Sequence, residues 1–263
     1  MNAMSTFAQR REINLQAYFN ESKFDLLKML RLPMYSVASI AFPVMFYLLF
    51  GVVFGKQGGQ GPQVARYLLG SYGAFGVIGA SLFGFGVGVA TERGQGWLQL
   101  KRASPMPPAA YFVAKLTTCM TFSLTIVIAL LLVGIMVGGV HLTAWQAVTL
   151  TAVLVAGSIP FCILGLAIAY FAGPNSAPAI VNLLYLPLSF CSGLWLPLNM
   201  LPPFLQKLAP ALPPYGLGQL ALMVLGFGRG TVGSHILGLG AWVAIGLGLA
   251  YYGYQRDEQK CYG

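Results

Sequence analysis

The chain has 263 residues, is 57% hydrophobic and 8% charged, and has a mean hydropathy of +0.73. From Leu116 to Gln206 it contains no Asp, Glu, Lys or Arg, which excludes an ordinary soluble domain because a soluble surface needs charge to stay hydrated. Membrane spans avoid charge, because one charged side chain at the centre of a spanning helix costs about 2.5–3.5 kcal/mol. The composition therefore predicts an all-α, polytopic membrane protein.

Residues 1–33 are predicted to form a cytoplasmic segment with an amphipathic helix that lies in the membrane interface. Polar and mostly apolar side chains separate onto different helical faces, which is typical of such helices. The apolar face contains Leu15, Tyr18, Phe19, Ser22, Leu26, Met29 and Leu30, and the polar face contains Asn14, Glu21, Asp25 and Lys28. The alternative is a generic basic lead-in to the first span.

Six apolar stretches of about 20 residues follow, and each is long enough to cross a hydrocarbon core of about 30 Å. Turns rich in Gly and Pro separate several of them. The predicted spans are Met34–Phe54, Tyr67–Ala90, Phe112–Val137, Trp145–Phe171, Ala177–Leu196 and Ile236–Tyr254. Together they form a predicted six-helix transmembrane domain over residues 34–254, with a cytoplasmic tail at 255–263.

Basic residues indicate the orientation of these spans. Most Lys and Arg residues lie before the first span, around the loop between spans two and three, and after the last span. The positive-inside rule then places both termini and that loop in the cytoplasm, and we expect a multi-pass protein of a plasma membrane, the inner membrane of a bacterium. We interpret the net charge of +9 as a topology signal and an attraction to anionic lipid, with no nucleic-acid binding.

The sequence lacks the residue sets that most membrane chemistry needs. No predicted span contains an acidic residue, since Glu92 falls at a cytoplasmic end, so proton coupling through this chain is not expected. We find no phosphate-binding loop, metal-ligand cluster or pair of nucleophile and base. We therefore expect no enzyme, no metal site and no cofactor in this chain.

The cytoplasmic loop at residues 91–111 has the most distinctive sequence. From Thr91 to Pro108 it reads TERGQGWLQLKRASPMPP. This order of a Glu-Arg pair, a Gly, a short helix and a Ser-Pro before the third span resembles the second-loop sequence of ABC-2 type permeases, the membrane subunits of many ATP-binding cassette exporters. Lys115 also stands where that family often has a Lys entering the third helix.

The segment after the fifth span supports the same resemblance. Residues 192–198, SGLWLPL, are similar to the exit of the family's fifth helix, and Asn199–Pro214 resembles its external re-entrant hairpin. The prolines of residues 197–235 forbid one continuous helix, and non-helical backbone at membrane depth must face protein or water. We therefore expect a re-entrant hairpin at 197–235 between spans five and six. The alternative is an amphipathic loop on the outer leaflet.

The resemblance implies that the 91–111 loop docks on a separate ATPase subunit, which holds ATP and magnesium, and transmits its closure to the bundle. The residue types suit this task, because a Glu-Arg pair forms charge-assisted bonds and Trp and Leu side chains anchor interfaces. The implied docking residues are Glu92, Arg93, Gly94, Gln95, Trp97, Leu98, Lys101, Arg102 and Pro105. The alternative is that Glu92 and Arg93 pair at a helix end and Trp97 lies in the aromatic belt.

The resemblance also implies a substrate path, because the first, second and fifth helices of this family surround one. The residues selected are aromatic residues of the first two spans and the polar face of the fifth. They are Phe42, Phe46, Phe75, Phe83, Asn182, Tyr185 and Ser189. The alternative is that these side chains pack the helices together or face lipid.

These features predict the permease subunit of an ABC exporter that moves a hydrophobic or amphipathic, drug- or antibiotic-like compound out of the cytoplasm or inner leaflet. Export of a lipid-linked glycan or polysaccharide is one alternative, and a membrane scaffold or sensor that transports nothing is another. A second copy of the chain is expected to form a homodimer, from the resemblance and from two small-residue faces. These faces are Gly70, Gly73, Gly76 and Gly79 of span two, and Gly240, Ala244 and Gly248 of span six.

Overall fold

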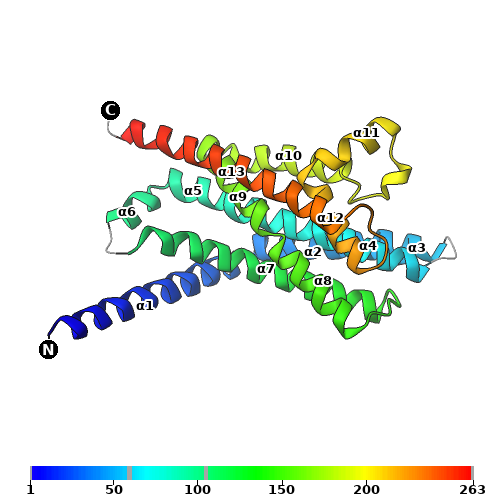
Figure 1. The fold of residues 1–263 in the computed structure, drawn as a ribbon, viewed down its shortest axis with the longest axis horizontal. Coiled ribbons are helices and arrows are strands. Elements are labelled where there is room, and N and C mark those ends of the chain that lie inside the picture. Colours follow the sequence, from blue (N-terminus) through cyan, green and yellow to red (C-terminus); the bar gives the residue numbers. More distant parts are fainter. Residues whose placement is uncertain (1, 58–60, 104–105, 262–263) are drawn as a thin grey trace.

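The computed structural model describes the backbone of residues 2–57, 61–103 and 106–261, without the side chains of 2–14, 56–57, 102, 108 and 258–261 (Figure 1). The described residues form helices and turns and contain no β-strand, which confirms the predicted all-α fold. The helices are α1 (Asn2–Leu30), α2 (Pro33–Phe46), η1 (Tyr47–Val53), α3 (Phe54–Gln57), α4 (Gly61–Ser81), η2 (Leu82–Val87), α5 (Gly88–Gly94), α6 (Trp97–Ala103), α7 (Pro108–Met136), α8 (Ala144–Ala156), α9 (Ile159–Phe171), α10 (Ala177–Cys191), η3 (Leu198–Met200), α11 (Pro203–Leu208), η4 (Ala209–Ala211), α12 (Pro213–Val224) and α13 (Val232–Cys261).

Five helical stretches of the described residues are long and apolar enough to cross a membrane. They are Pro33–Val53, Gly61–Gly94, Ala109–Met136, Ala144–Phe171 and Val232–Asp257. These stretches coincide with the predicted first, second, third, fourth and sixth spans. Their lengths of 21 to 34 residues suffice for a hydrocarbon core of about 30 Å, so the prediction of a multi-pass membrane protein is confirmed.

The predicted fifth span, Ala177–Leu196, is a shorter helix in the structure. α10 ends at Cys191 after 15 residues, and its length of about 22 Å is less than the thickness of the hydrocarbon core. Gly193 then turns the chain with a φ of +76°, a conformation that glycine adopts because it has no Cβ. Six full spans are therefore not confirmed, since the described chain has five long spans and this short apolar helix.

α4 runs through the centre of the bundle and is buried along most of its length. Its four glycines at three-residue spacing face different neighbours, because three residues of a helix turn by about 300°. A Cβ added at Gly70, Gly73 or Gly79 would come within 3.0 Å of side chains at the end of α12, in α8 and in α10, respectively, and one at Gly76 would come within 3.0 Å of side chains in both α7 and α2. These four glycines pack against other helices of the same chain, so their predicted role in joining a second copy is wrong. Gly240 and Gly248 of α13 have open space around them.

The segment after α10 returns to the bundle as two short helices, α11 and α12. Pro203 and Pro213 are their first residues, where the missing N–H of proline costs no helical hydrogen bond. α12 packs against α4, α8 and α13, and its buried Gln219 accepts a hydrogen bond of 2.8 Å from the backbone N–H of Arg229. The interrupted helix agrees with the proline pattern, and its re-entrant depth in a membrane stays a prediction.

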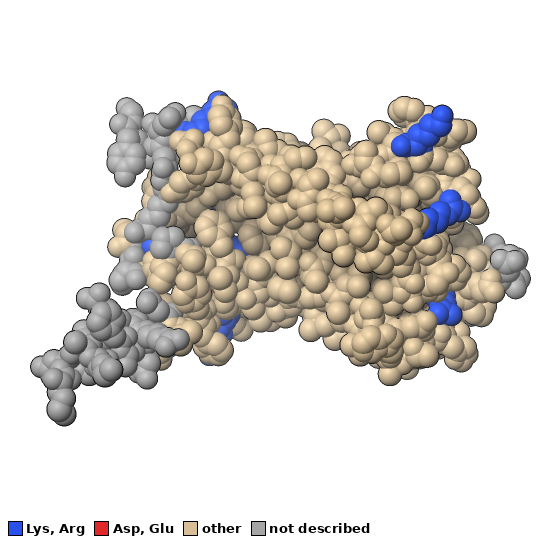
Figure 2. Space-filling model, viewed as in Figure 1, with Lys and Arg blue, Asp and Glu red and all other residues tan. Residues whose placement is uncertain are grey.

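The start of α1, the short helix α6 and the end of α13 lie at one end of the bundle, which we call the α6 end (Figure 1). α3 and α11 lie at the other end. On the face shown in Figure 2, Lys and Arg side chains lie near the two ends and the broad middle carries no charge. Such a band is the part of the surface that suits hydrocarbon.

Candidate functional site

Five side chains form a charge cluster at the α6 end: Asp25 and Lys28 of α1, Glu92 of α5, and Tyr111 and Lys115 of α7. All are buried except Lys28, whose side chain is 49% exposed. Lys115 Nζ lies 2.6 Å from Asp25 Oδ1 and 2.8 Å from Glu92 Oε1. Glu92 also accepts hydrogen bonds of 2.7 Å from Lys28 Nζ and from the Tyr111 hydroxyl. Two carboxylates face two ammonium groups, so each buried charge has a partner and the cluster joins three helices.

Arg93 ties the same end of the second span to α9 and α13. Its guanidinium donates hydrogen bonds to the carbonyl oxygens of Tyr170 (2.7 Å) and Ala172 (3.0 Å), and lies 3.4 Å from Asp257 Oδ1. These carbonyls are at the end of α9, where the helix itself supplies no donor. Glu92 and Arg93 therefore bind within the chain, each to other partners, and their contact with an ATPase subunit stays a prediction.

α6 is the helix of the predicted docking loop. Gly96, with a φ of +76°, makes the turn between α5 and α6. Trp97 and Leu100 lie three positions apart on one face and are 51% and 65% exposed. Lys101 forms an ion pair with Glu21 of α1. α6 is thus held against α1 and keeps an apolar face exposed.

The other predicted docking residues differ in their accessibility. Gly94 and Gln95 are exposed, and Leu98 is half-buried against the bundle. A Cβ added at Gly94 would come 2.6 Å from the loop that precedes α10, so glycine permits close packing there. The side chain of Arg102 and all of Pro105 lie outside the described residues.

α1 contacts the bundle with residues of both predicted faces, because Asp25 of the polar face and Met29 of the apolar face are buried, whereas Lys28 is exposed. Asp25 and Lys28 belong to the charge cluster, and Glu21 binds α6. Leu15 and Phe19 are exposed on the face predicted to be apolar. An exposed apolar face suits a helix lying in the membrane interface, and the polar face meets α7 because Lys115 needs acidic partners there.

A cavity of about 380 Å³ lies between α2, the end of α4 with η2, and α10, and we call it the path cavity. Phe42, Phe83, Asn182 and Tyr185 line it, and all four belong to the predicted path. Tyr185 stacks on Phe75 with 4.8 Å between ring centroids and donates a hydrogen bond of 2.8 Å to the Phe75 carbonyl oxygen. The fold thus brings these predicted residues together, and their contact with a substrate stays a prediction.

Phe46 lies between the path cavity and a second cavity nearer the opposite end. Its ring centroid is 4.6 Å from that of Phe42, 5.9 Å from that of Phe50 and 5.1 Å from that of Trp195. Phe42 lines the path cavity, whereas Phe50 and Trp195 line the second cavity, of about 470 Å³, which we call the mouth cavity. We call Phe46, Phe75 and Trp195, whose rings are in mutual contact, the aromatic barrier.

Polar groups along this route lack protein partners. The Asn182 side chain is exposed at the rim of the path cavity and makes no hydrogen bond with any described residue. Toward the mouth cavity, the hydroxyls of Ser189 and Ser192 and the indole N–H of Trp195 are buried, and within the described chain they have no partner. Buried polar groups are normally paired, so these atoms are exceptions within the described chain.

Sequence analysis did not identify the acidic partners of Lys115. Asp25 was assigned to the polar face of an interfacial helix, and Tyr111 and Thr118 were not selected at all, although Thr118 Oγ1 donates a 2.8 Å hydrogen bond to Asp25. The usable signal was Lys115 itself. A lone cation inside an apolar span requires a carboxylate nearby, and Glu92 and Asp25 were the candidates at that depth.

The ABC-2 type transporter family matches residues 19–224, which is most of the chain. The chain belongs to the ABC-2 type transporter family. It is also 27% identical over 239 residues to the "Putative transport permease YvfS" of Bacillus subtilis (strain 168), covering 90% of this chain and 97% of that protein.

Membership in the ABC-2 family makes the chain a transport permease, a subunit without enzymatic activity. It also implies association with an ATP-binding subunit.

Proposed function

We propose that this ABC-2 permease is the membrane subunit of an ATP-driven exporter of hydrophobic or amphipathic compounds of drug or antibiotic type. The path cavity is the observation that carries the proposal. Phe42, Phe83 and Tyr185 offer aromatic surface, and Asn182 offers an unpaired carboxamide. A mostly apolar wall with few polar groups suits an amphipathic ligand, because the rings bind its apolar body and the carboxamide orients it.

The order of the two cavities supports a route through the membrane. The compound enters the path cavity from the cytoplasm or the inner leaflet, beside Met34 and Tyr35 at the α6 end. It passes Phe46, which closes the aromatic barrier, and leaves through the mouth cavity beside Pro197 and Met200. Rings in van der Waals contact separate without breaking hydrogen bonds, so a small movement of α2 away from α10 opens the barrier.

A lipid-linked glycan or polysaccharide is the second candidate substrate. A saccharide needs many hydrogen-bonding groups along its path, and the path cavity offers Ser39 and Asn182 among mostly apolar residues. The aromatic lining therefore favours the drug-like compound. Two cavities in line also favour transport over a scaffold or sensor role.

We propose that two copies of the chain form a homodimer in which α2 and α10 of each copy face the path. Asn182 and Leu183 are exposed on α10, and Val37 and Met45 are exposed on α2. An exposed carboxamide on an apolar helix is unfavourable in lipid and is satisfied against a second copy or a water-filled path.

ATP and magnesium are proposed to bind in the partner ATPase, and no cofactor is proposed in this chain. The exposed face of Trp97 and Leu100 on α6 is the proposed contact with that subunit, on the cytoplasmic side of a bacterial inner membrane. The charge cluster and Arg93 fix α6 and α5 to α1, α7 and α9, so a push on α6 moves the ends of several helices together.

The test is ATP-dependent export of amphipathic fluorescent dyes from proteoliposomes that hold the permease and the ATPase that copurifies with it. Asn182→Ala is expected to change the order in which the dyes are exported. Leu132→Ala, at an exposed position of α7 that lines none of the cavities described here, is the control. If a normally assembled Asn182→Ala complex exports the dyes in an unchanged order, the proposed path through the path cavity is contradicted. If the permease purifies without an ATPase, the proposal that ATP drives the export is contradicted.

A further inference from the structure

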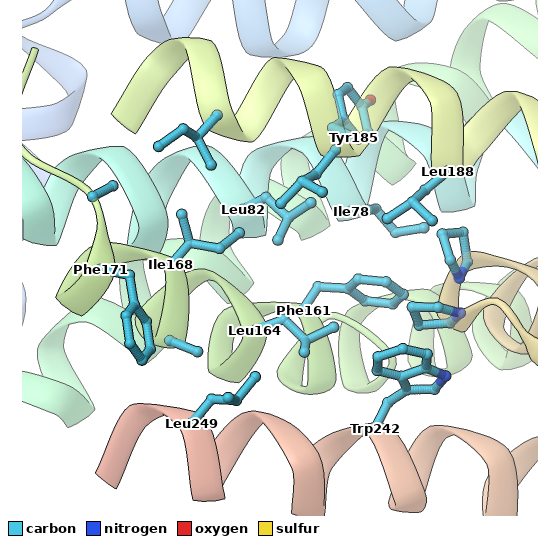
Figure 3. A pocket seen from close by; sticks show the side chains of 16 residues that line it. Ile78, Leu82, Phe161, Leu164, Ile168, Phe171, Tyr185, Leu188, Trp242 and Leu249 are labelled. Atoms are coloured by element: carbon cyan, nitrogen blue, oxygen red, sulfur yellow. The ribbon is translucent and has the colours of Figure 1, made fainter. Parts of the chain in front are cut away.

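A third cavity, of about 440 Å³, lies on the flank of the bundle between α9, α10, the start of α12 and α13 (Figure 3). We call it the lateral cavity. Phe161 and Leu164 of α9, Leu188 of α10, and Trp242 and Leu249 of α13 point into it. The volume is within the range of about 300–1,000 Å³ that small-molecule sites occupy. The proposed export function assigns no task to this cavity.

The wall of the lateral cavity offers a ligand no free side-chain hydrogen-bonding group. Its side-chain polar atoms are the Tyr185 hydroxyl and the Trp242 indole N–H. The first donates to the Phe75 carbonyl oxygen at 2.8 Å and the second to the Ala211 carbonyl oxygen at 3.1 Å. A ligand with polar atoms would leave them unpaired there, at a cost of about 1–3 kcal/mol each. The lining of the cavity therefore suits a hydrocarbon chain.

The lateral cavity opens sideways, toward the surrounding bilayer. Its back wall contains residues that are almost completely buried, such as Ile78 and Phe161, whereas Phe171, Leu184 and Leu249 at its rim are exposed. A non-helical protein segment would bring backbone N–H and C=O groups that find no partners at this wall. A lipid acyl chain brings none and enters from the side without leaving the membrane.

Arg256 stands at the α6 end of the same groove. Trp242, Leu249 and Arg256 are spaced by seven residues on α13, so they lie on one face of the helix. The Arg256 side chain is exposed and makes no ion pair with any described residue. The 14 residues from Trp242 to Arg256 span about 21 Å, which matches one leaflet, about half of a bilayer 40–45 Å thick.

We propose that the lateral cavity holds one acyl chain of an anionic phospholipid from the leaflet at the α6 end, with the lipid phosphate bound by Arg256. The acyl chain fills the space between α10 and α13 down to Trp242. A guanidinium next to the headgroup layer binds phosphate through paired N–H donors. This site shares only Tyr185 with the lining of the path cavity, and it does not depend on the proposed export function.

The test uses the full-length permease in phosphatidylcholine vesicles that contain phosphatidylglycerol with a photoreactive diazirine at the end of one acyl chain. After irradiation, labelled residues are mapped by peptide mass spectrometry. Leu249→Trp and Ile180→Trp add bulk at the rim of the cavity, and Leu237→Trp, at an exposed position of α13 away from the cavity, is the matched control. Arg256→Gln and Arg256→Lys test the headgroup contact.

The expected result is labelling concentrated on Phe161, Leu164 and Trp242, lost in Leu249→Trp and Ile180→Trp and kept in Leu237→Trp. Arg256→Gln is expected to lower the labelling about fivefold, the effect of one basic side chain beside anionic lipid, and Arg256→Lys is expected to restore most of it. Labelling spread evenly over exposed residues of α7 and the cavity alike overturns the acyl-chain site. Equal labelling of Arg256→Gln and wild type overturns the phosphate contact.

Discussion

Lys115 and Glu92 form an ion pair of 2.8 Å whose two side chains are only 1% and 4% exposed. The same ammonium group also contacts Asp25 at 2.6 Å, so one lysine of α7 holds α1 and α5 together. Burying a charge is unfavourable unless it is paired, and removing one partner of a buried pair costs about 3–5 kcal/mol. The arrangement of the α6 end therefore depends on this side chain.

Lys115→Met is expected to lower the free energy of unfolding by about 3–5 kcal/mol, because it leaves the carboxylates of Glu92 and Asp25 buried with less compensation. Thermal unfolding of the purified protein in one detergent measures the effect. Lys207→Met, which removes an exposed lysine of α11, is the matched control and is expected to change little. Equal unfolding temperatures for the two variants would falsify the structural role of the charge cluster.

Trp97→Ala and Leu100→Ala are expected to weaken binding of the ATPase subunit without changing the stability of the permease, because both side chains are exposed on α6. An interface anchor contributes about 2 kcal/mol or more, so affinity should fall about thirtyfold for Trp97→Ala. The dissociation constant of the purified ATPase from the permease in nanodiscs measures this loss of affinity. Trp145→Ala, at an exposed tryptophan of α8, controls for loss of an indole elsewhere, and unchanged affinity for Trp97→Ala rejects this docking face.

Phe46→Ala is expected to open a leak through the aromatic barrier, because Phe46 fills the space between the path cavity and the mouth cavity. Dyes that are normally exported should then cross proteoliposomes without ATP, down their gradient. The measurement is dye efflux before any ATP is added. Phe204→Ala removes an exposed ring of α11 and should not leak. Tight vesicles with Phe46→Ala would show that the barrier lies elsewhere.

Gly79→Ala is expected to destabilise the protein by about 1–3 kcal/mol and to displace Tyr185, because the new Cβ would lie 2.7 Å from the Tyr185 hydroxyl. The hydrogen bond from Tyr185 to the Phe75 carbonyl is expected to be lost with it. Gly240→Ala on α13 has open space and serves as the control. Thermal unfolding compares the two, and an equally small effect of both substitutions would contradict the close packing of α4 on α10.

The sequence was sufficient to predict the helical class and the five long spans, because a long apolar stretch without charges is typical of a membrane-spanning helix. It overestimated the fifth span, since the hydropathy of residues 177–196 does not reveal where Gly193 turns the chain. The aromatic and polar residues of the path were selected from a resemblance, and the fold brings Phe42, Phe83, Asn182 and Tyr185 to one cavity.

The position of the charged residues was harder to predict than the position of the helices. Glu92 and Arg93 have the composition of a docking pair, but which partner a charge binds depends on tertiary neighbours far away in the sequence, such as Asp25 and Tyr170. The regular spacing of the glycines in span two predicted a close-packing surface for a second copy of the chain. Spacing alone does not reveal whether the helix that packs on a glycine belongs to the same chain or to another. In the structure five different elements approach these glycines.

The charge cluster also bears on how the protein is made. Asp25 and Glu92 precede Lys115 in the sequence, so both carboxylates leave the ribosome before the lysine that they bind. A lone lysine near the start of the third span adds to the cost of inserting that span. Asp25 and Glu92, if they are already at the membrane surface, lower that cost by pairing with the lysine. Assembly of this permease should therefore proceed in chain order, with α1 and the second span in place before α7 enters.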